Sequence, residues 1–213
     1  MASYPSPSDR ILRYSAGERV THWIVAICFV LSALSGLALL HPSMFFFSNL
    51  FGGGPWTRIL HPFIGLAMAL AFAVFAVHHI ADNLLGGNDR QWLLQWRDIA
   101  ANRMDKLPEA GKYNAGQKVL FWILVLLMLL LVTTGFLFWR PWFAHLLPIG
   151  VVRFATLLHA VAAMGLILII IGHIYMAIWT TWSVRAMVRG WVTTRWARHH
   201  HPAWYREVTK DRP

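Results

Sequence analysis

The amino-acid sequence predicts an all-α integral membrane protein, a bundle of four spanning helices. Of its 213 residues, 57% are hydrophobic and only 13% are charged, and the mean hydropathy is +0.50. Soluble domains carry about a quarter charged residues, so this shortage of charge indicates a membrane protein. Four long apolar runs contain neither Asp nor Glu. Because lipid offers the backbone no hydrogen-bond partner, packed helices are the expected form of such runs.

The four runs approach or exceed the ~20 residues that a helix needs to cross the hydrocarbon core. Helix breakers or charges bound them: His41-Pro42 follows the first run, and Arg140-Pro141 follows the third. The last run is longer than a bilayer requires, so its C-terminal turns are expected to project into water. Within a single domain of residues 1–213, the expected spans are Thr21–Leu40, Leu60–Ile80, Val119–Trp139 and Val151–Trp182.

Lys and Arg predict the direction of the spans. Sixteen of the nineteen lie in the N-terminal segment, the Ala81–Lys118 connection and the C-terminal tail, whereas Arg58, Arg140 and Arg153 flank the opposite ends of the spans. The positive-inside rule therefore predicts that both termini are cytoplasmic. The net charge of +10 does not indicate a nucleic-acid partner, because the basic residues are spread between apolar runs rather than gathered in one arm.

The two ends of the chain carry further signals. No small-residue cleavage site follows a short hydrophobic stretch near the N-terminus, so the first run is expected to remain a helix rather than a removed signal peptide. The tail Ser183–Pro213 alternates Arg with Trp. It suits an interfacial helix on the inner leaflet or a docking segment, with a solvated tail anchored by Trp as the alternative. The lone Cys28 excludes intrachain disulfides and cysteine-ligated clusters.

Histidines inside the apolar runs carry the functional prediction. Ionisable groups at membrane depth are costly and usually have a task, and imidazole is a common ligand of haem iron. His159 and His173 lie fourteen residues apart on one span. This spacing places both rings on the same side of a helix, roughly 21 Å apart along its axis. It suits two haems, one near each membrane surface.

Each iron needs a second ligand from another helix, and depth pairs the histidines. His22 begins the first span at its cytoplasmic end, and His61 begins the second at its outer end. The last span runs inward, so His61 pairs with His159 near the outer surface and His22 with His173 near the inner one. The sequence predicts two bis-histidine haem b sites, which suit electron relay rather than oxygen binding. Five glycines in the runs would allow close helix contact or room for a flat cofactor: Gly36, Gly65, Gly135, Gly165 and Gly172.

Alternatives to this ligand set remain. A single intramembrane histidine is more often an interhelical hydrogen-bonding residue than a ligand. His78 and His79 are competitors for the place of His22. His61 and His79 share a helix face, but their ~27 Å separation does not match the ~21 Å of the other pair. We therefore expect His78 and His79 at the water boundary. The run His199–His201 is expected to be solvent-exposed, with weak metal binding as the alternative.

At these residues the chain resembles the γ subunit of respiratory formate dehydrogenases, the membrane cytochrome b of the N and O type. The likeness covers almost the whole chain in order, beyond the first ten or so residues, and the motifs are specific as a set. The matching segments are Arg13-Tyr14 through Glu18-Arg19-Val20-Thr21-His22-Trp23, Leu60-His61-Pro62-Phe63, Gly111–Lys118, Arg153-Phe154-Ala155 before Leu158-His159, His173-Ile174-Tyr175, and His200–Val208.

The resemblance implies the same ligand pairing that depth predicts. It also implies a quinone site on the cytoplasmic side, beside the inner haem, in the loop Gly111–Lys118. There the side chains of Asn114 and Gln117 would hydrogen-bond menaquinone or ubiquinone, with His173 as a further contact. From the residues alone, helix capping by Asn114 is the alternative.

The resemblance further implies a complex in the bacterial inner membrane. A molybdopterin catalytic α subunit would oxidise formate outside, and an iron–sulfur β subunit would pass the electrons to this chain. The chain would carry the quinone-reduction site but not formate oxidation, for which it has no site. Arg58 and Arg153 for the outer haem, and Arg19 for the inner one, are candidate partners of the haem propionates, and topology signals are the alternative.

Rival functions remain open. Cytochrome b subunits of nickel–iron hydrogenases or thiosulfate reductases, and a free-standing superoxide–quinone enzyme, would share the haems and differ in the electron donor. A rival of another class is a haem-free membrane anchor or transporter whose histidines relay protons.

Overall fold

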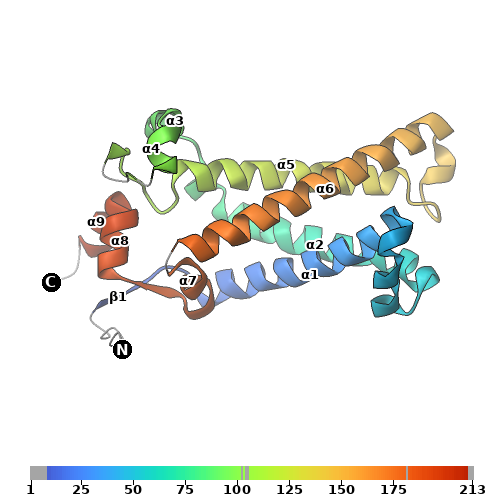
Figure 1. The fold of residues 1–213 in the computed structure, drawn as a ribbon, viewed down its shortest axis with the longest axis horizontal. Coiled ribbons are helices and arrows are strands. Elements are labelled where there is room, and N and C mark those ends of the chain that lie inside the picture. Colours follow the sequence, from blue (N-terminus) through green and yellow to red (C-terminus); the bar gives the residue numbers. More distant parts are fainter. Residues whose placement is uncertain (1–8, 102, 104–105, 181, 211–213) are drawn as a thin grey trace. The chain divides into compact units, whose positions relative to one another are not determined.

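Four long helices dominate the computed structural model, which describes residues 9–101, 103, 106–180 and 182–210. All four are long and apolar enough to cross a membrane, which confirms the predicted number of spans (Figure 1). The first eight residues, included in the signal-peptide prediction, lie outside the described part. The long helices are α1 (Ala16–Leu40), α2 (Gly54–His79), α5 (Ala115–Leu137) and α6 (Ile149–Trp179).

Polar caps start two of these helices a turn or more before the apolar runs on which the prediction rested. At the start of α1, the backbone N–H of Glu18 donates to Ser15 Oγ at 3.2 Å, and Glu18 Oε2 accepts from the Ser15 N–H at 2.7 Å. At the start of α5, Asn114 and Gln117 make the same reciprocal pair at 2.9 and 3.0 Å. Both are capping boxes, which satisfy N–H groups that the first helical turn leaves without a partner.

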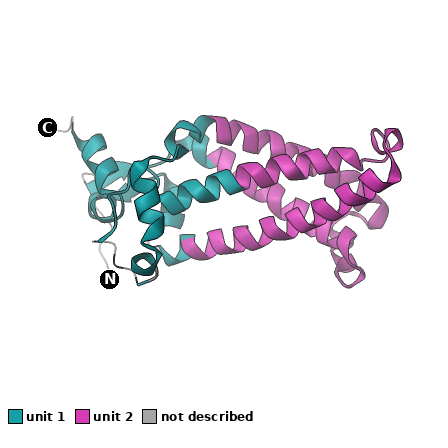
Figure 2. Cartoon of the chain, turned by 90° about the horizontal axis from the view of Figure 1, so that it is seen from above, with its two compact units in different colours: residues 1–19, 78–123, 177–213 teal, residues 20–77, 124–176 magenta. Residues whose placement is uncertain are grey.

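The chain divides into two compact units (Figure 2). Unit 1 comprises residues 1–19, 78–123 and 177–213, and unit 2 comprises residues 20–77 and 124–176. Unit 2 therefore contains most of each long helix, and unit 1 contains the connection between α2 and α5 and the two terminal segments.

Unit 2 has a small apolar interior and an apolar outside. Met68 and Phe72 of α2 pack with Met128 of α5, and a second cluster joins α5 with α6. Large apolar side chains elsewhere on these helices are exposed, among them Leu70, Val74, Leu126, Leu129, Leu157 and Leu168. An apolar surface of this extent is expected where helices face lipid rather than water.

Unit 1 adds shorter elements and a two-stranded sheet, so the all-α class holds for the long helices but not for every element. Strand β1 (Arg10–Leu12) pairs antiparallel with β2 (Trp191–Thr193), and Ile11 lies opposite Val192. The short helices are η2 (Pro42–Phe51, in unit 2), η3 (Ala81–Asn83), α3 (Gly87–Leu94), α4 (Trp96–Ala100), η5 (Ala144–Leu146, in unit 2), α7 (Ser183–Arg189), α8 (Thr194–His200) and α9 (Pro202–Thr209).

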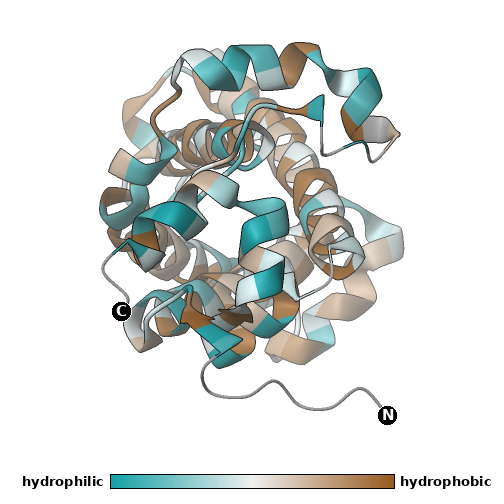
Figure 3. Cartoon of the chain, turned by 90° about the vertical axis from the view of Figure 1, so that its left-hand side faces the viewer, coloured by the Kyte–Doolittle hydropathy of each residue, from teal (hydrophilic) through white to brown (hydrophobic). Residues whose placement is uncertain are grey.

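The C-terminal tail is folded around a core of its own. Ile11 and Val192 of the sheet are buried together with Trp196 of α8 and Trp204 of α9. Hydrophilic residues are frequent on the short helices and the long helices are mainly hydrophobic (Figure 3). Trp196 and Trp204 therefore do not fit the alternative of exposed Trp anchors, because both indole rings face the core of unit 1. Residues 211–213 lie outside the described part.

We predict that Gly190 is required for the sheet. Its φ is +87°, and a Cβ there would lie 2.8 Å from the carbonyl oxygen of Tyr14. Gly190→Ala should destabilise unit 1 by about 2 kcal/mol, since a left-handed backbone alone costs roughly 1–2 kcal/mol. Limited proteolysis of the tail in detergent measures the loss. Gly87→Ala is the matched control, because an added Cβ at Gly87 has nothing within 4 Å. Equal protease resistance of the two variants would refute the prediction.

Candidate functional site

Two of the four predicted ligands lie face to edge in unit 2. The ring of His61 on α2 and the ring of His159 on α6 have centroids 6.3 Å apart and planes at 75°. Two imidazoles on opposite sides of one metal ion, each with a metal–nitrogen distance of roughly 2 Å, have ring centres roughly 6 Å apart. The spacing of His61 and His159 therefore fits a shared iron.

Each of these two rings is held by a hydroxyl group from a neighbouring helix. Ser35 Oγ of α1 lies 2.8 Å from His61 Nδ1, and Thr134 Oγ1 of α5 lies 3.0 Å from His159 Nδ1. Both hydroxyl residues are buried, with 0% and 3% of their surface exposed. Neither residue was predicted from the sequence. Their available signal was a Ser-Gly and a Thr-Gly pair, each inside an otherwise apolar run.

The glycine after each hydroxyl residue lies against the same ring. A Cβ added at Gly36 would meet His61 Cε1 at 3.2 Å, and one added at Gly135 would meet His159 Cε1 at 3.5 Å. Both glycines therefore admit an imidazole against bare helix backbone. At Gly65, Gly165 and Gly172 nothing in the described part lies within 4 Å of an added Cβ. Close helix contact does not explain these three, which fit the alternative of room for a flat cofactor.

The other two predicted ligands also lie close to each other, in unit 2. His22 of α1 and His173 of α6 are near enough for a charge on one ring to act on the other. His22 makes aromatic contacts with Trp23 and Phe75, at centroid distances of 5.4 and 6.4 Å. Its Nδ1 is buried and has no hydrogen-bond partner among the described residues. This pair differs from the first, since among the four predicted ligands only His61 and His159 have a hydroxyl partner within the described residues.

Asn114 and Gln117, the candidates for quinone binding, are engaged in the cap of α5. The side-chain oxygens of both residues accept backbone N–H groups. Capping, the alternative from the residues alone, is therefore present. The side-chain NH₂ groups are not used in the cap, and an amide NH₂ can donate to a quinone oxygen. One side chain can thus cap the helix and bind a ligand.

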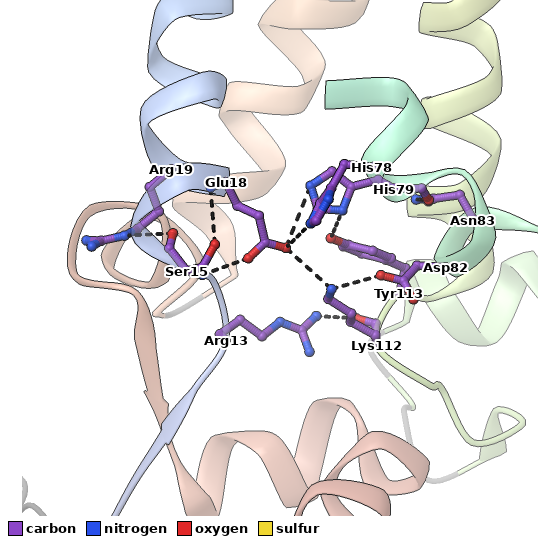
Figure 4. A network of polar contacts seen from close by, with 10 residues as sticks. All are labelled: Arg13, Ser15, Glu18, Arg19, His78, His79, Asp82, Asn83, Lys112 and Tyr113. Atoms are coloured by element: carbon purple, nitrogen blue, oxygen red, sulfur yellow. Dashed lines mark hydrogen bonds and ion pairs between the residues drawn. The ribbon is translucent and has the colours of Figure 1, made fainter. Parts of the chain in front are cut away.

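A cluster of charged and polar side chains in unit 1 was not predicted (Figure 4). Glu18 Oε1 lies 3.8 Å from the Nε2 atoms of both His78 and His79, and 3.5 Å from Lys112 Nζ. Lys112 Nζ also pairs with Asp82 at 2.8 Å. Within the chain His79 is only 1% exposed, whereas His78 is exposed. These contacts join residues far apart in sequence, so no local pattern could indicate them.

This cluster is better suited to ion pairing than to a metal ion. Glu18, His78 and His79 offer three ligand atoms within 4.8 Å of one another. However, the ammonium of Lys112 lies against the same Glu18 oxygen. A cation bound there would meet an existing positive charge, which opposes binding.

Tyr113 links the cluster to the loop before α5. Its hydroxyl lies 3.5 Å from His79 Nδ1, and its ring packs edge-on against the His79 ring at 6.2 Å. Burial raises the pKa of Tyr113 because it disfavours the phenolate, and the nearby Tyr14 adds to the rise. The phenol therefore stays neutral.

Arg13 and His201 fasten the same loop to the C-terminal tail. His201 is only 3% exposed, so the expectation of solvent exposure is wrong for this residue. Its Nδ1 lies 2.7 Å from the Gly111 carbonyl oxygen, and its Nε2 lies 3.4 Å from the Arg13 guanidinium. A carbonyl accepts and a guanidinium donates, so the His201 ring is neutral with its proton on Nδ1. Arg13 also donates to the Lys112 carbonyl and lies 4.4 Å over the Trp204 ring.

Comparison with known proteins shows which family and which proteins the chain is similar to. The model of the prokaryotic cytochrome b561 family matches residues 13–190. A formate dehydrogenase cytochrome b556(fdo) subunit of Escherichia coli K12 is 44% identical over 202 residues, 95% of each chain. The nitrate-inducible formate dehydrogenase cytochrome b556(Fdn) subunit of the same strain is 41% identical over 96% of this chain and 94% of its own. A formate dehydrogenase cytochrome b556 subunit of Haemophilus influenzae is 40% identical over 95% of this chain and 85% of its own.

We predict a pH-dependent loss of stability at His201. Burial, with the charge of Arg13, lowers the pKa of His201 from 6.5 to about 3, so the folded chain resists a proton that the unfolded chain accepts. The stability is therefore complete above pH 6.5 and is lost as the pH falls towards 3. At pH 5.5 the loss should be about 1.4 kcal/mol relative to pH 7.5.

Thermal unfolding or limited proteolysis of unit 1 at the two pH values measures this loss. His201→Gln, which keeps a donor and an acceptor, should remove the His201 share of the pH dependence. His199→Gln, at an exposed position, should leave it unchanged. A His201→Gln variant with the same pH dependence as the unaltered chain would contradict the assignment.

Proposed function

The chain belongs to the prokaryotic cytochrome b561 family, and from this premise we propose that it is the membrane cytochrome b subunit of a formate dehydrogenase. The observation that carries the proposal is the pair His61 and His159, whose 6.3 Å ring separation fits a metal held between two imidazoles. Relatives that are named as formate dehydrogenase subunits and match almost the whole chain support the identity of the complex.

We propose that four histidines hold two b haems, treating residues 1–213 as one functional domain. His61 and His159 would hold the outer haem, and His22 and His173 the inner one. The family supports haem b, and the bare helix surface at Gly65, Gly165 and Gly172 supports space for flat groups. Arg58 and Arg153 remain candidates for the outer propionates, and Arg19 for the inner ones.

The residues of this chain would bind the haems and keep dioxygen and water away from them. Bound haem supplies one-electron transfer, and two of them at two depths offer electrons a path across the membrane. With two imidazoles held at each iron, His61 and His159 or His22 and His173, these residues would leave dioxygen no place to bind. Apolar side chains of α1, α2, α5 and α6 surround the sites and keep water from them.

Quinone reduction would occur beside the loop Gly111–Lys118. The side-chain NH₂ groups of Asn114 and Gln117 would donate to a carbonyl oxygen of menaquinone or ubiquinone, with His173 as a further contact. Reduction to quinol consumes two electrons and two protons. Tyr113 joins this loop to titratable groups, including Glu18 and His79.

The distribution of Lys and Arg indicates how the helices are oriented in the membrane. We propose that both termini face the cytoplasm of a bacterium and that the helices cross its inner membrane. An electron that moves inward then works against the membrane potential, at about 2.3 kcal/mol per 100 mV. The tail, with its many Arg residues, would lie at the inner leaflet. The relay therefore conserves energy from formate oxidation as a proton-motive force.

The electron donor would be an iron–sulfur β subunit that receives electrons from a molybdopterin α subunit. Purification of the intact complex, followed by formate:quinone and hydrogen:quinone assays, tests this assembly. We expect formate-dependent quinone reduction and co-purification of a molybdopterin subunit. Hydrogen-dependent reduction with a hydrogenase subunit would refute the formate assignment in favour of the hydrogenase alternative.

We predict that ligand substitution removes one haem at a time. His61→Ala or His159→Ala should halve the haem content per chain and remove one b-type component from the reduced spectrum. His22→Ala or His173→Ala should remove the other component. Pyridine haemochrome assays and low-temperature spectra measure both.

His145→Ala, outside the proposed ligand set, is the control and should keep the full haem content. Loss of both haems, or of neither, from His61→Ala would count against this pairing. A purified chain without a b-type α band after dithionite reduction would end the cytochrome assignment.

A further inference from the structure

The hydroxyl groups beside His61 and His159 each lie close to a carbonyl oxygen of their own helix, which bears on whether they donate to or accept from the imidazole. Ser35 Oγ lies 2.7 Å from the carbonyl oxygen of Leu31, and Thr134 Oγ1 lies 2.6 Å from that of Leu130. Each hydroxyl also lies near a second carbonyl oxygen, that of Ser32 at 3.1 Å and that of Leu131 at 3.2 Å. A carbonyl cannot donate, so we assign the single hydroxyl proton to these carbonyl oxygens. Towards the imidazole, the hydroxyl oxygen can then only accept.

The tautomer of both histidines follows from this constraint. If Ser35 Oγ accepts at 2.8 Å, His61 must carry its proton on Nδ1, and the same holds for His159 opposite Thr134 at 3.0 Å. Nε2 is then the nitrogen with the lone pair that a metal needs. The two hydroxyls thus select the neutral, Nε2-ligating form of each ring.

We infer that Ser35 and Thr134 are positioning residues that set the orientation, tautomer and basicity of the two outer ligands. This inference rests on the proposed haem ligation by His61 and His159. A partner that accepts a hydrogen bond from the Nδ1–H group makes the imidazole a more basic ligand. A more basic ligand favours ferric over ferrous iron, so the hydroxyls lower the midpoint potential of the outer site.

Within the described residues, the inner pair has no hydroxyl that accepts a hydrogen bond from a ligand Nδ1, and His22 Nδ1 is buried without a hydrogen-bond partner. On this ground alone the inner site has the higher potential. Electrons entering at the outer site would then move towards the inner one with a favourable difference in potential. The hydroxyls therefore bias the direction of transfer across the membrane.

The experiment is a potentiometric titration of the holo-protein, with haem content and low-temperature electron paramagnetic resonance as further readouts. The variants are Ser35→Ala, Thr134→Val, which keeps the shape of Thr, and Thr134→Ser, which keeps the hydroxyl. Ser32→Ala and Thr133→Val are matched controls on the same two helices. The Ser32 hydroxyl makes no hydrogen bond in the described part, and Thr133 is exposed.

We expect Ser35→Ala and Thr134→Val to lower the ratio of ferric to ferrous affinity at one haem roughly tenfold, a positive shift of about 59 mV for a one-electron couple. The signal of that haem should broaden or move, and the other haem should keep its potential. Thr134→Ser and both controls should match the unaltered protein. Loss of the outer haem from Thr134→Val, with retention in Thr134→Ser, would also support the inference.

Unchanged potentials in Ser35→Ala and Thr134→Val would overturn the inference, as would equal shifts in Thr134→Val and Thr134→Ser, which would indicate packing alone. Failure of the proposed function has a different signature. In that case His61→Ala would leave the haem content unaltered, whereas failure of this inference leaves the loss of one haem in His61→Ala intact.

Discussion

A buried imidazole has two nitrogens, and in a low-dielectric interior each needs a partner, since an unpaired polar group there costs several kcal/mol. The organisation of unit 2 depends on this constraint. For His61 and His159, one nitrogen faces a hydroxyl from a neighbouring helix and the other remains for a ligand. The helices are thereby tied in pairs, α1 to α2 and α5 to α6, through the groups that would bind the metal.

The same requirement explains the small residues around the rings. An imidazole that reaches a hydroxyl on the next helix must pass close to that helix, and Gly36 and Gly135 leave the backbone bare at the point of passage. In each Ser-Gly or Thr-Gly pair, the hydroxyl residue therefore accepts a hydrogen bond from the imidazole, and the glycine leaves space for the ring. The repetition of this arrangement on α1 and α5 argues against coincidence.

In unit 1, the polar side chains away from water include charged groups, which are stabilised by opposite charges, aromatic rings and backbone carbonyls. The Glu18 carboxylate and the Lys112 ammonium pair beside the buried His79 ring, while Arg13 is enclosed by aromatic rings and donates to a backbone carbonyl. The chain between α4 and α5 is tied to both ends of the protein through these groups. Buried ion pairs contribute little net stability but are costly to break singly, so they specify one arrangement of the loop.

The sequence by itself determined the number of spans, the four intramembrane histidines and the family, because hydropathy, spacing and motif order are local properties of the chain. It also offered capping of α5 by Asn114 as an alternative, since capping needs only neighbouring residues. The tertiary structure decided which residues support those histidines. Ser35 contacts His61, and Thr134 contacts His159, across helices, and the partners are 26 and 25 positions apart in sequence. The burial of His201 was not predicted for the same reason, because the groups that bury it come from segments that are distant in sequence.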